Sequence, residues 1–99
     1  MLENFRTYQL SIGFYKECKK VKLPYYLCNQ LLRAASSVTL NLAEGSTKPT
    51  KKDQRKFYHI AFASLREVQS IIDLEEKSLS LIKKDADVLA AHLYKLCRS

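Results

Sequence analysis

A chain of 99 residues with 46% hydrophobic and 27% charged side chains has the composition of one globular domain, which excludes wholesale disorder and a multidomain architecture. Only two glycines and two prolines occur, too few for the turns of an all-β fold, so residues 1–99 are predicted to form a single all-α domain. The 17 Lys and Arg against 10 Asp and Glu leave a net charge of +7, which is typical of proteins with a polyanionic partner such as nucleic acid or an anionic membrane. A soluble surface that happens to be basic is the alternative that net charge leaves open.

The first predicted helix lies near the N-terminus and is expected to end among the lysines of residues 19–22, because cations are favourable at a helix C-terminus. The dipeptide Leu23-Pro24 then breaks the chain, and proline is well placed at the first position of the next helix. The apolar residues of the first helix recur at spacings of three and four, typical of a helix packed on one face: Phe5, Tyr8, Ile12 and Tyr15.

The second predicted helix ends at Gly45, because a glycine just past a helix end can take the left-handed conformation without a Cβ penalty. After a loop of residues 46–49, Thr50 with Asp53 resembles a capping box that begins the third helix. The second helix presents one apolar stripe: Leu27, Leu31, Ala34, Val38 and Leu42.

The third predicted helix is the longest, from Lys51 to about Ser78, and it is apolar on two adjoining faces. One stripe comprises Phe57, Ala61, Ser64, Val68 and Ile71. The second comprises Tyr58, Phe62, Leu65, Ile72 and Leu79. A bundle core needs one such stripe, and a broad exposed apolar face is a liability on a monomer. The second stripe therefore predicts a face for self-association: Tyr58, Phe62, Leu65 and Ile72.

The fourth predicted helix follows a turn at residues 80–84 and has Asp85 and Asp87 in its first turn, where anions are favourable. Its inward-facing residues are Leu89, Leu93 and Leu96. Short connections between four helices predict an antiparallel up-down-up-down four-helix bundle.

Cysteine usage and hydropathy indicate a cytoplasmic protein. Cys18, Cys28 and Cys97 are odd in number and form no C-x-x-C pair, so they are expected to be reduced. No charged-then-apolar leader opens the sequence, and no apolar run approaches the roughly 20 residues of a membrane span. Neither a membrane nor a zinc site is therefore expected.

No catalytic motif is found. His59 and His92 are the only histidines, and neither has a His or Cys at i+3 or i+4 that would make a helical metal pair. Glu-x-x-His, P-loop, G-x-S-x-G and G-x-G-x-x-G patterns are absent from the sequence. The expectation is a protein with no enzymatic activity, no cofactor and no metal.

A signature in the second and third helices resembles a known family. Its pieces are Leu23-Pro24, Gln30-Leu31-x-Arg33-Ala34-Ala35-x-Ser37, Asn41-Leu42-Ala43-Glu44-Gly45, and then Phe57, Ala61, Ser64 and Glu67. Together they resemble the 23S rRNA intervening sequence proteins, some of which are encoded inside bacterial 23S rRNA genes. The resemblance implies an up-down bundle that assembles into a ring of five subunits. It is also similar in fold to the accessory proteins of diversity-generating retroelements, basic pentameric bundles that bind nucleic acid and a reverse transcriptase.

Four polar residues lie on or beside apolar stripes, where a buried polar group must be paired. The hypothesis is a hydrogen-bonded cluster that fixes helix register or joins subunits. Its members are Arg33, Asn41, Glu44 and Glu67. An active site made of the same residues is the minor alternative.

The lysines are predicted to gather at the two ends of the bundle. One set is Lys16, Lys19, Lys20 and Lys22, with Lys83 and Lys84, and the other is Lys48, Lys51, Lys52, Arg55 and Lys56. Each set alone is an ordinary solvated loop, but repeated around a ring it would bind phosphate backbones without reading sequence. Tyr25, Tyr26 and Tyr58 lie nearby, and packing is the favoured role for them over base stacking.

The sequence thus predicts a non-catalytic homo-oligomer that binds nucleic acid, RNA in preference to DNA. The alternative is a protein–protein scaffold, for example an accessory subunit of a nucleic-acid enzyme.

Overall fold

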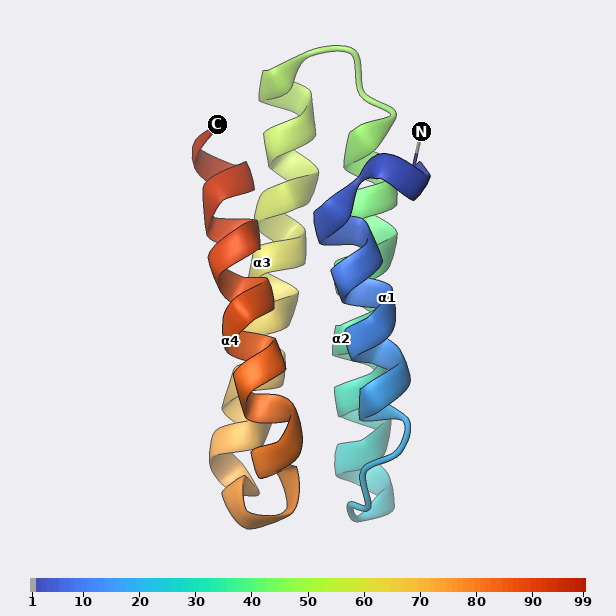
Figure 1. The fold of residues 1–99 in the computed structure, drawn as a ribbon, viewed down its shortest axis with the longest axis vertical. Coiled ribbons are helices and arrows are strands. Elements are labelled where there is room, and N and C mark those ends of the chain that lie inside the picture. The colour runs from blue at the N-terminus through green and yellow to red at the C-terminus, as the bar shows by residue number, and fades with distance from the viewer. Residues whose placement is uncertain (1) are drawn as a thin grey trace.

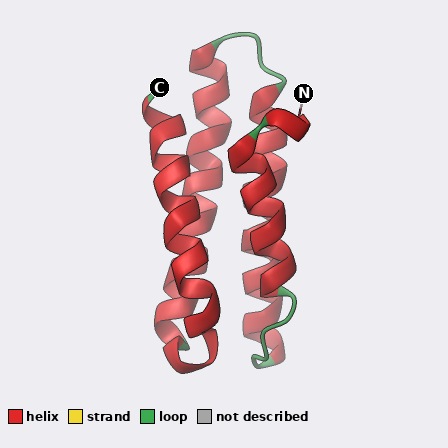
Figure 2. Cartoon of the chain, in the orientation of Figure 1, coloured by secondary structure: helices red, strands yellow, loops and turns green. Residues whose placement is uncertain are grey.

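The computed structural model describes residues 2–99, with the side chains of residues 76–78 left out of the description. A short 3-10 helix, η1 (Leu2–Asn4), precedes four α-helices: α1 (Arg6–Cys18), α2 (Tyr25–Ser46), α3 (Lys51–Leu74) and α4 (Glu76–Arg98). Successive helices run in opposite directions, as Figures 1 and 2 show. The described residues contain no strand, so the predicted all-α four-helix bundle is confirmed.

Each helix packs mainly on the two that flank it. The α2/α3 and α3/α4 pairs have the most extensive contacts, and α1 closes the bundle by packing on both α2 and α4. The side chains at the centre come from three helices and are less than 2% exposed: Leu31, Leu42, Leu65, Ile72, Leu79, Leu89 and Leu93. Because α1 has only 13 residues, it covers a shorter length than the 22 to 24 residues of the other helices.

The buried face of α1 differs from the predicted one. Its buried residues are Thr7, Ser11, Phe14 and Cys18, while the predicted stripe of Phe5, Tyr8, Ile12 and Tyr15 is half-buried along the edges. The Ser11 hydroxyl is tolerated inside because it is hydrogen-bonded: Ser11 Oγ donates to Tyr8 O at 2.7 Å and accepts from Thr39 Oγ1 at 2.8 Å. The periodicity was counted from apolar residues alone, so it missed a face built on small polar ones.

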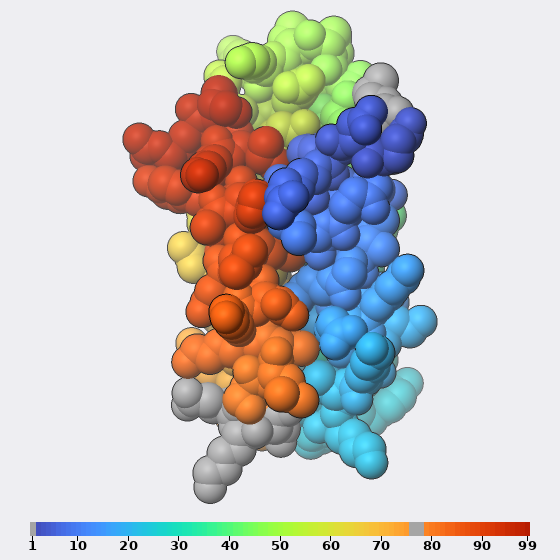
Figure 3. All heavy atoms as spheres, in the orientation of Figure 1, coloured from blue at the N-terminus to red at the C-terminus, as the bar shows by residue number. Residues whose placement is uncertain are grey.

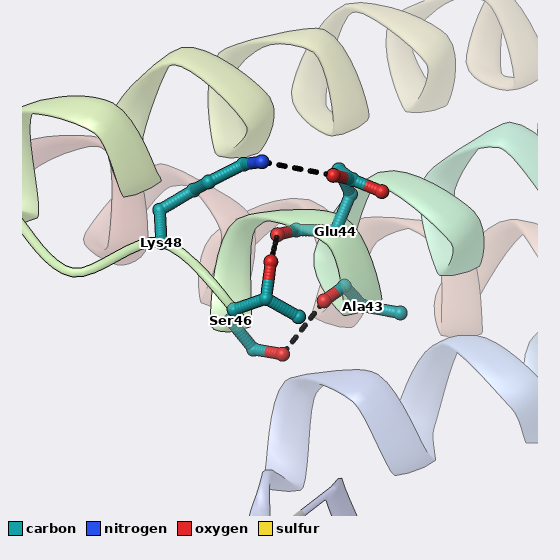
Figure 4. Close-up of polar contacts among 5 residues, drawn as sticks. Ala43, Glu44, Ser46 and Lys48 are labelled. Carbon is teal, nitrogen blue, oxygen red and sulfur yellow. Dashed lines mark hydrogen bonds and ion pairs between the residues drawn. The ribbon is translucent and has the colours of Figure 1, made fainter.

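The helix α2 continues through Gly45 instead of ending there. The described residues contain no positive φ, so the glycine is not a left-handed cap. Its role is to let α3 approach, since a Cβ at Gly45 would lie 2.7 Å from Tyr58 Cε1 and 3.1 Å from Phe57 Cβ. The helix is capped by hydroxyls, with Ser46 Oγ donating to Ala43 O (Figure 4) and Thr47 Oγ1 donating to Glu44 O, each at 2.7 Å.

The starts of α2 and α3 follow their sequence signals closely. Thr50 is the N-cap of α3, and its Oγ1 accepts a hydrogen bond from the Asp53 backbone N–H at 3.1 Å, as the capping pattern predicted. Pro24 was predicted to be the first helical residue and instead is the N-cap of α2, one position earlier; its carbonyl accepts from the backbone N–H groups of Leu27 and Cys28.

The boundary between α3 and α4 was predicted wrongly. The third helix ends at Leu74 instead of near Ser78, and α4 begins at Glu76. Leu79 therefore belongs to α4, and Asp85 and Asp87 lie well inside that helix instead of in its first turn. The turn consists of Glu75 alone, at φ −127° and ψ 45°, with no glycine or proline to mark it in the sequence.

The predicted self-association face on α3 also requires correction. Leu65 and Ile72 are at most 2% exposed and Tyr58 is 7% exposed within a single chain, while Phe62 is half-buried. The physical reason is that α3 lies between α2 and α4, so both of its apolar stripes are covered by neighbours in the same chain. These residues form the core, and any interface between copies must lie elsewhere.

The two glycines provide a matched test of this packing. We expect Gly45→Ala to lower the free energy of unfolding by about 1–3 kcal/mol, because the added methyl group forces the buried Tyr58 ring to move. Gly13 has nothing within 4 Å of its ideal Cβ, so Gly13→Ala should raise stability by about 0.5–1 kcal/mol through helix propensity alone. Urea titration followed by circular dichroism measures both, and equal effects would contradict the close approach.

Candidate functional site

One end of the bundle gathers positive charge from two distant parts of the sequence. The α2–α3 connection and the C-terminus of α4 lie at the same end, as Figure 1 shows. In Figure 3 the last turns of α4 (red) and the α2–α3 connection (green) form this end of the surface. The residues of what we call the basic pole are Lys48, Lys51, Lys52, Arg55 and Lys56, joined by Lys95 and Arg98 from the last turn of α4.

Lys95 and Arg98 were missing from the predicted set. Their distance in sequence from the lysines of residues 48–56 hid the relationship. The up-down order of the helices was the signal that would have found them, because it returns the end of α4 to the pole where α2 meets α3. A direct contact joins the two segments: Arg55 Nη1 donates to the Ser99 main-chain oxygen at 2.8 Å.

The cations of the basic pole differ in the ion pairs that they form. Lys48 Nζ is 3.0 Å from Glu44 Oε2 (Figure 4), and Lys56 Nζ is 3.5 Å from Asp53 Oδ1. The Lys56 pair is exposed, whereas Lys48 is half-buried in the loop after α2; near-surface pairs of this kind contribute little stability and can exchange with other ligands. Lys51, Lys52 and Lys95 are exposed and make no ion pair with any residue that the structure describes.

The opposite pole carries a more mixed charge. Lys20 Nζ is 2.8 Å from Glu17 Oε2, and Lys19 lies over the Tyr15 ring at 5.8 Å. Lys20 and Lys22 line a hollow with Glu17 and with Leu81 of α4, so the α1–α2 loop does meet α4 as predicted. The remaining predicted members are Lys16 and Lys84, which are exposed, and Lys83, which lines a different hollow on the α3/α4 seam.

The predicted polar cluster does not form by hydrogen bonds within the chain. Arg33, Glu44 and Glu67 are exposed, and among the described contacts none joins two members of the set. Asn41 Nδ2 instead donates to Ser37 O at 2.9 Å and to Ser37 Oγ at 3.1 Å. The remaining form of the hypothesis, a cluster between subunits, stays a prediction.

The polar link that does form between helices uses hydroxyls. Ser37 Oγ of α2 and Ser64 Oγ of α3 are 2.8 Å apart, and Asn41 completes this network from the next turn of α2. Small side chains at both positions let α2 and α3 approach closely, and these two helices share the most extensive contact in the bundle. The hydrogen bond satisfies both hydroxyls within that contact. The network is structural, since it lies part-buried in the α2/α3 seam.

Five of the exposed large apolar side chains lie in two regions. A groove between α1 and α2 is lined by Ile12, Tyr15, Lys16, Ser36, Thr39 and Leu40, and Leu40 is 66% exposed. At the pole opposite the basic one, four side chains are 67–88% exposed: Tyr25, Tyr26, Leu74 and Leu81. Tyr25 and Tyr26 are therefore not core residues, whereas Tyr58 is.

Burial shifts the pKa of two cysteines. Burial raises the pKa of the Cys18 thiol to about 12, and the adjacent Glu17 carboxylate adds to the rise. Burial also raises the pKa of Cys97, whereas a reactive cysteine needs a lowered one. Among the described residues, no three or more His, Cys, Asp and Glu side chains gather in a way that could hold a metal ion. Nor does any helix in the described part have the length and hydropathy to cross a membrane.

The three cysteines should therefore differ sharply in reactivity. In variants that each retain one cysteine, the half-buried Cys28 should react with a disulfide reagent at pH 8 far faster than Cys18. The pKa of about 12 against an ordinary 9.0 lowers the thiolate fraction of Cys18 by roughly a thousandfold. Because the unfolded chain ionises first, the free energy of unfolding should also fall as pH rises above 9. Similar rates for both cysteines in the folded protein, measured against a guanidinium-unfolded control, would contradict the burial of Cys18.

Comparison with known proteins adds one match. The family model described as 23S rRNA-intervening sequence protein matches residues 3–99, which include all four α-helices of the bundle. No curated protein matches the chain. The match extends well beyond the signature in α2 and α3, so it covers both segments that build the basic pole.

Proposed function

The chain belongs to the 23S rRNA-intervening sequence protein family, and we propose that it is a non-catalytic, cytoplasmic homo-oligomer that binds nucleic acid, RNA in preference to DNA. The observation that carries the proposal is the basic pole, where seven Lys and Arg residues from α3, α4 and the α2–α3 loop meet. Among the residues that the structure describes, Glu44 and Asp53 are the acidic residues that form ion pairs with these cations. Such an array binds phosphates by releasing counterions and needs no sequence-specific contact.

The position of the lysines supports binding over stability as their role. Lys51 and Lys52 are the first two residues of α3, where a cation opposes the helix dipole. Folding therefore gains nothing from their charge. A phosphate at this end would interact favourably with both the lysines and the helix N-terminus.

The apolar groove between α1 and α2 supports self-association. Leu40 stands exposed beside Ile12 and Tyr15, and a second copy would remove these carbon surfaces from water. The groove lies between α1 and α2, on the side of the bundle opposite the contact between α3 and α4. Assembly through it would repeat the basic pole around an axis and leave α3 and α4 free, with five subunits as the number implied by the family resemblance.

A protein partner is the second candidate function. The exposed Tyr25, Tyr26, Leu74 and Leu81 make the pole opposite the basic one rich in apolar side chains, which nucleic acid would not require. An accessory subunit would use this surface for its partner and the basic pole for the shared nucleic acid.

Paired charge reversals at the two poles test the nucleic-acid proposal. Lys51→Glu/Lys52→Glu should weaken binding to a fluorescent single-stranded RNA, and should lower the slope of log K against log salt by roughly 1.4, or 0.7 per lost phosphate contact. The control is Lys19→Glu/Lys20→Glu, an equal change of charge at an exposed pair on the opposite pole. Fluorescence anisotropy at salt concentrations from roughly 50 to 300 mM, where such contacts become screened, measures the affinity and the salt slope of both variants. Equal losses would show that net charge matters and the basic pole does not.

Light scattering tests self-association. The wild type should have a mass several times the 11.4 kDa of one chain. Leu40→Glu should reduce it, because a charge would be buried in the interface. Leu74→Glu, at a residue 74% exposed outside the groove, is the matched control and should leave the mass unchanged. A wild-type mass of 11.4 kDa would refute the oligomer.

A further inference from the structure

Two cation–aromatic pairs meet across the α3/α4 seam. Arg66 Cζ lies 4.7 Å from the Phe62 ring centroid, and Arg98 Cζ lies 5.1 Å from that of Tyr94. The two rings meet edge-on across the seam, with centroids 6.3 Å apart. We call Arg66, Phe62, Tyr94 and Arg98 the cation–aromatic ladder.

The ladder is accessible and begins at the basic pole. Tyr94 is 49% exposed, both arginines are exposed, and Phe62 is half-buried beneath them. Arg98 belongs to the last turn of α4 and is itself a member of the basic pole. The aromatic surface therefore continues directly from the cations that the proposed function assigns to phosphates.

The other end of the ladder is closed by a carboxylate. Arg66 Nη1 donates to Gln69 Oε1 at 2.7 Å, and Gln69 Nε2 donates to Asp87 Oδ1 at 3.0 Å. The hollow beyond is lined by two carboxylates and two cations: Asp73, Asp87, Arg66 and Lys83. The ladder therefore ends at a surface of balanced charge, which attracts phosphates less than the basic pole does.

Core packing does not require the exposed half of the ladder. The buried residues of this part of α4 are Leu89, Ala90, Leu93 and Cys97, and Tyr94 and Arg98 point away from them. Arg98 Nη1 donates to Tyr94 Oη at 2.8 Å, and Arg98 Cζ lies 5.1 Å from the ring centroid, so the guanidinium is held beside the ring. A guanidinium in this position can offer its planar face to a base and its remaining N–H groups to phosphate.

We propose that the ladder binds the unpaired bases of a single-stranded nucleic acid whose phosphates are held by the basic pole. This inference rests on the proposed function and adds a preference for single strands. Aromatic rings and guanidinium planes stack on any base, so the contact tolerates sequence. A duplex keeps its bases paired and stacked, and offers only its phosphates to the same surface.

The test separates bases from phosphates by using three RNA strands of equal length and charge. These are dodecauridine, the same strand with four central 2′-deoxyuridines, and the same strand with four central abasic spacers. Binding by Tyr94→Ala, Tyr94→Phe and the wild type is measured by fluorescence anisotropy. The control is Tyr25→Ala, which removes a tyrosine that is 81% exposed at the opposite pole.

We expect Tyr94→Ala to bind the two base-bearing strands roughly tenfold more weakly than the wild type, with an unchanged salt slope because no charge is lost. Tyr25→Ala should bind as the wild type does, and Tyr94→Phe, which keeps the ring and loses only the hydroxyl that Arg98 binds, should lose much less affinity than Tyr94→Ala. On the abasic strand, Tyr94→Ala and the wild type should be equal. If Tyr94→Ala melts at a much lower temperature than the wild type, Arg98→Gln replaces it as the test variant. Its affinity should fall more for the base-bearing strands than for the abasic strand.

Two outcomes overturn the inference in distinguishable ways. If Tyr94→Ala changes nothing, or weakens all three strands equally, while Lys51→Glu/Lys52→Glu still weakens binding, the ladder is not a base-binding surface and the basic pole stands. If the wild type binds none of the strands, both the ladder and the proposed function are wrong.

Discussion

The position of α3 between α2 and α4 determines most of what this molecule presents to solvent. Leu65 and Val68 are fully buried, and Ile71 and Ile72 are at most 4% exposed, so two adjoining faces of α3 are used within one chain. Only the remaining face reaches the surface, and it carries His59, Arg66 and Asp73. The polar character of the α3/α4 seam follows from this arrangement, because most apolar residues of α3 are already in the core, with Ile60 and Leu74 the exposed large ones.

Burial of α3 on two sides also explains which structural features could be predicted from the sequence and which could not. The helical class, the α2 stripe and the Thr50 cap could be predicted because each rests on neighbours within a few residues. The exposed face assigned to Tyr58, Phe62, Leu65 and Ile72 was wrong because a periodic pattern shows how many faces are apolar, and does not show which neighbour covers them. The Glu75 turn left no signal, since a single residue of ordinary type makes it.

The same limit applies to the surface proposed to bind nucleic acid. Lysines clustered at residues 48–56 are visible in the sequence, but Lys95 and Arg98 join them only after the bundle returns α4 to the same end. Tyr94 and Phe62 come from different helices, and their edge-on contact depends on the register of α3 against α4. Register is set by core side chains such as Leu89 and Leu93, so it follows from three-dimensional packing and is hidden in a local pattern.

The close approach of α2 and α3 at Gly45 has a consequence for the kinetics of folding. These helices are joined by a loop of four residues, from Thr47 to Thr50, and they share the most extensive interhelical contact of the bundle. Closing so short a loop costs little chain entropy, and contacts between sequence neighbours form early on the folding pathway. The α2–α3 hairpin is thus suited to act as a nucleus onto which α4 and then the shorter α1 condense, which places the chain among the fast-folding helical bundles.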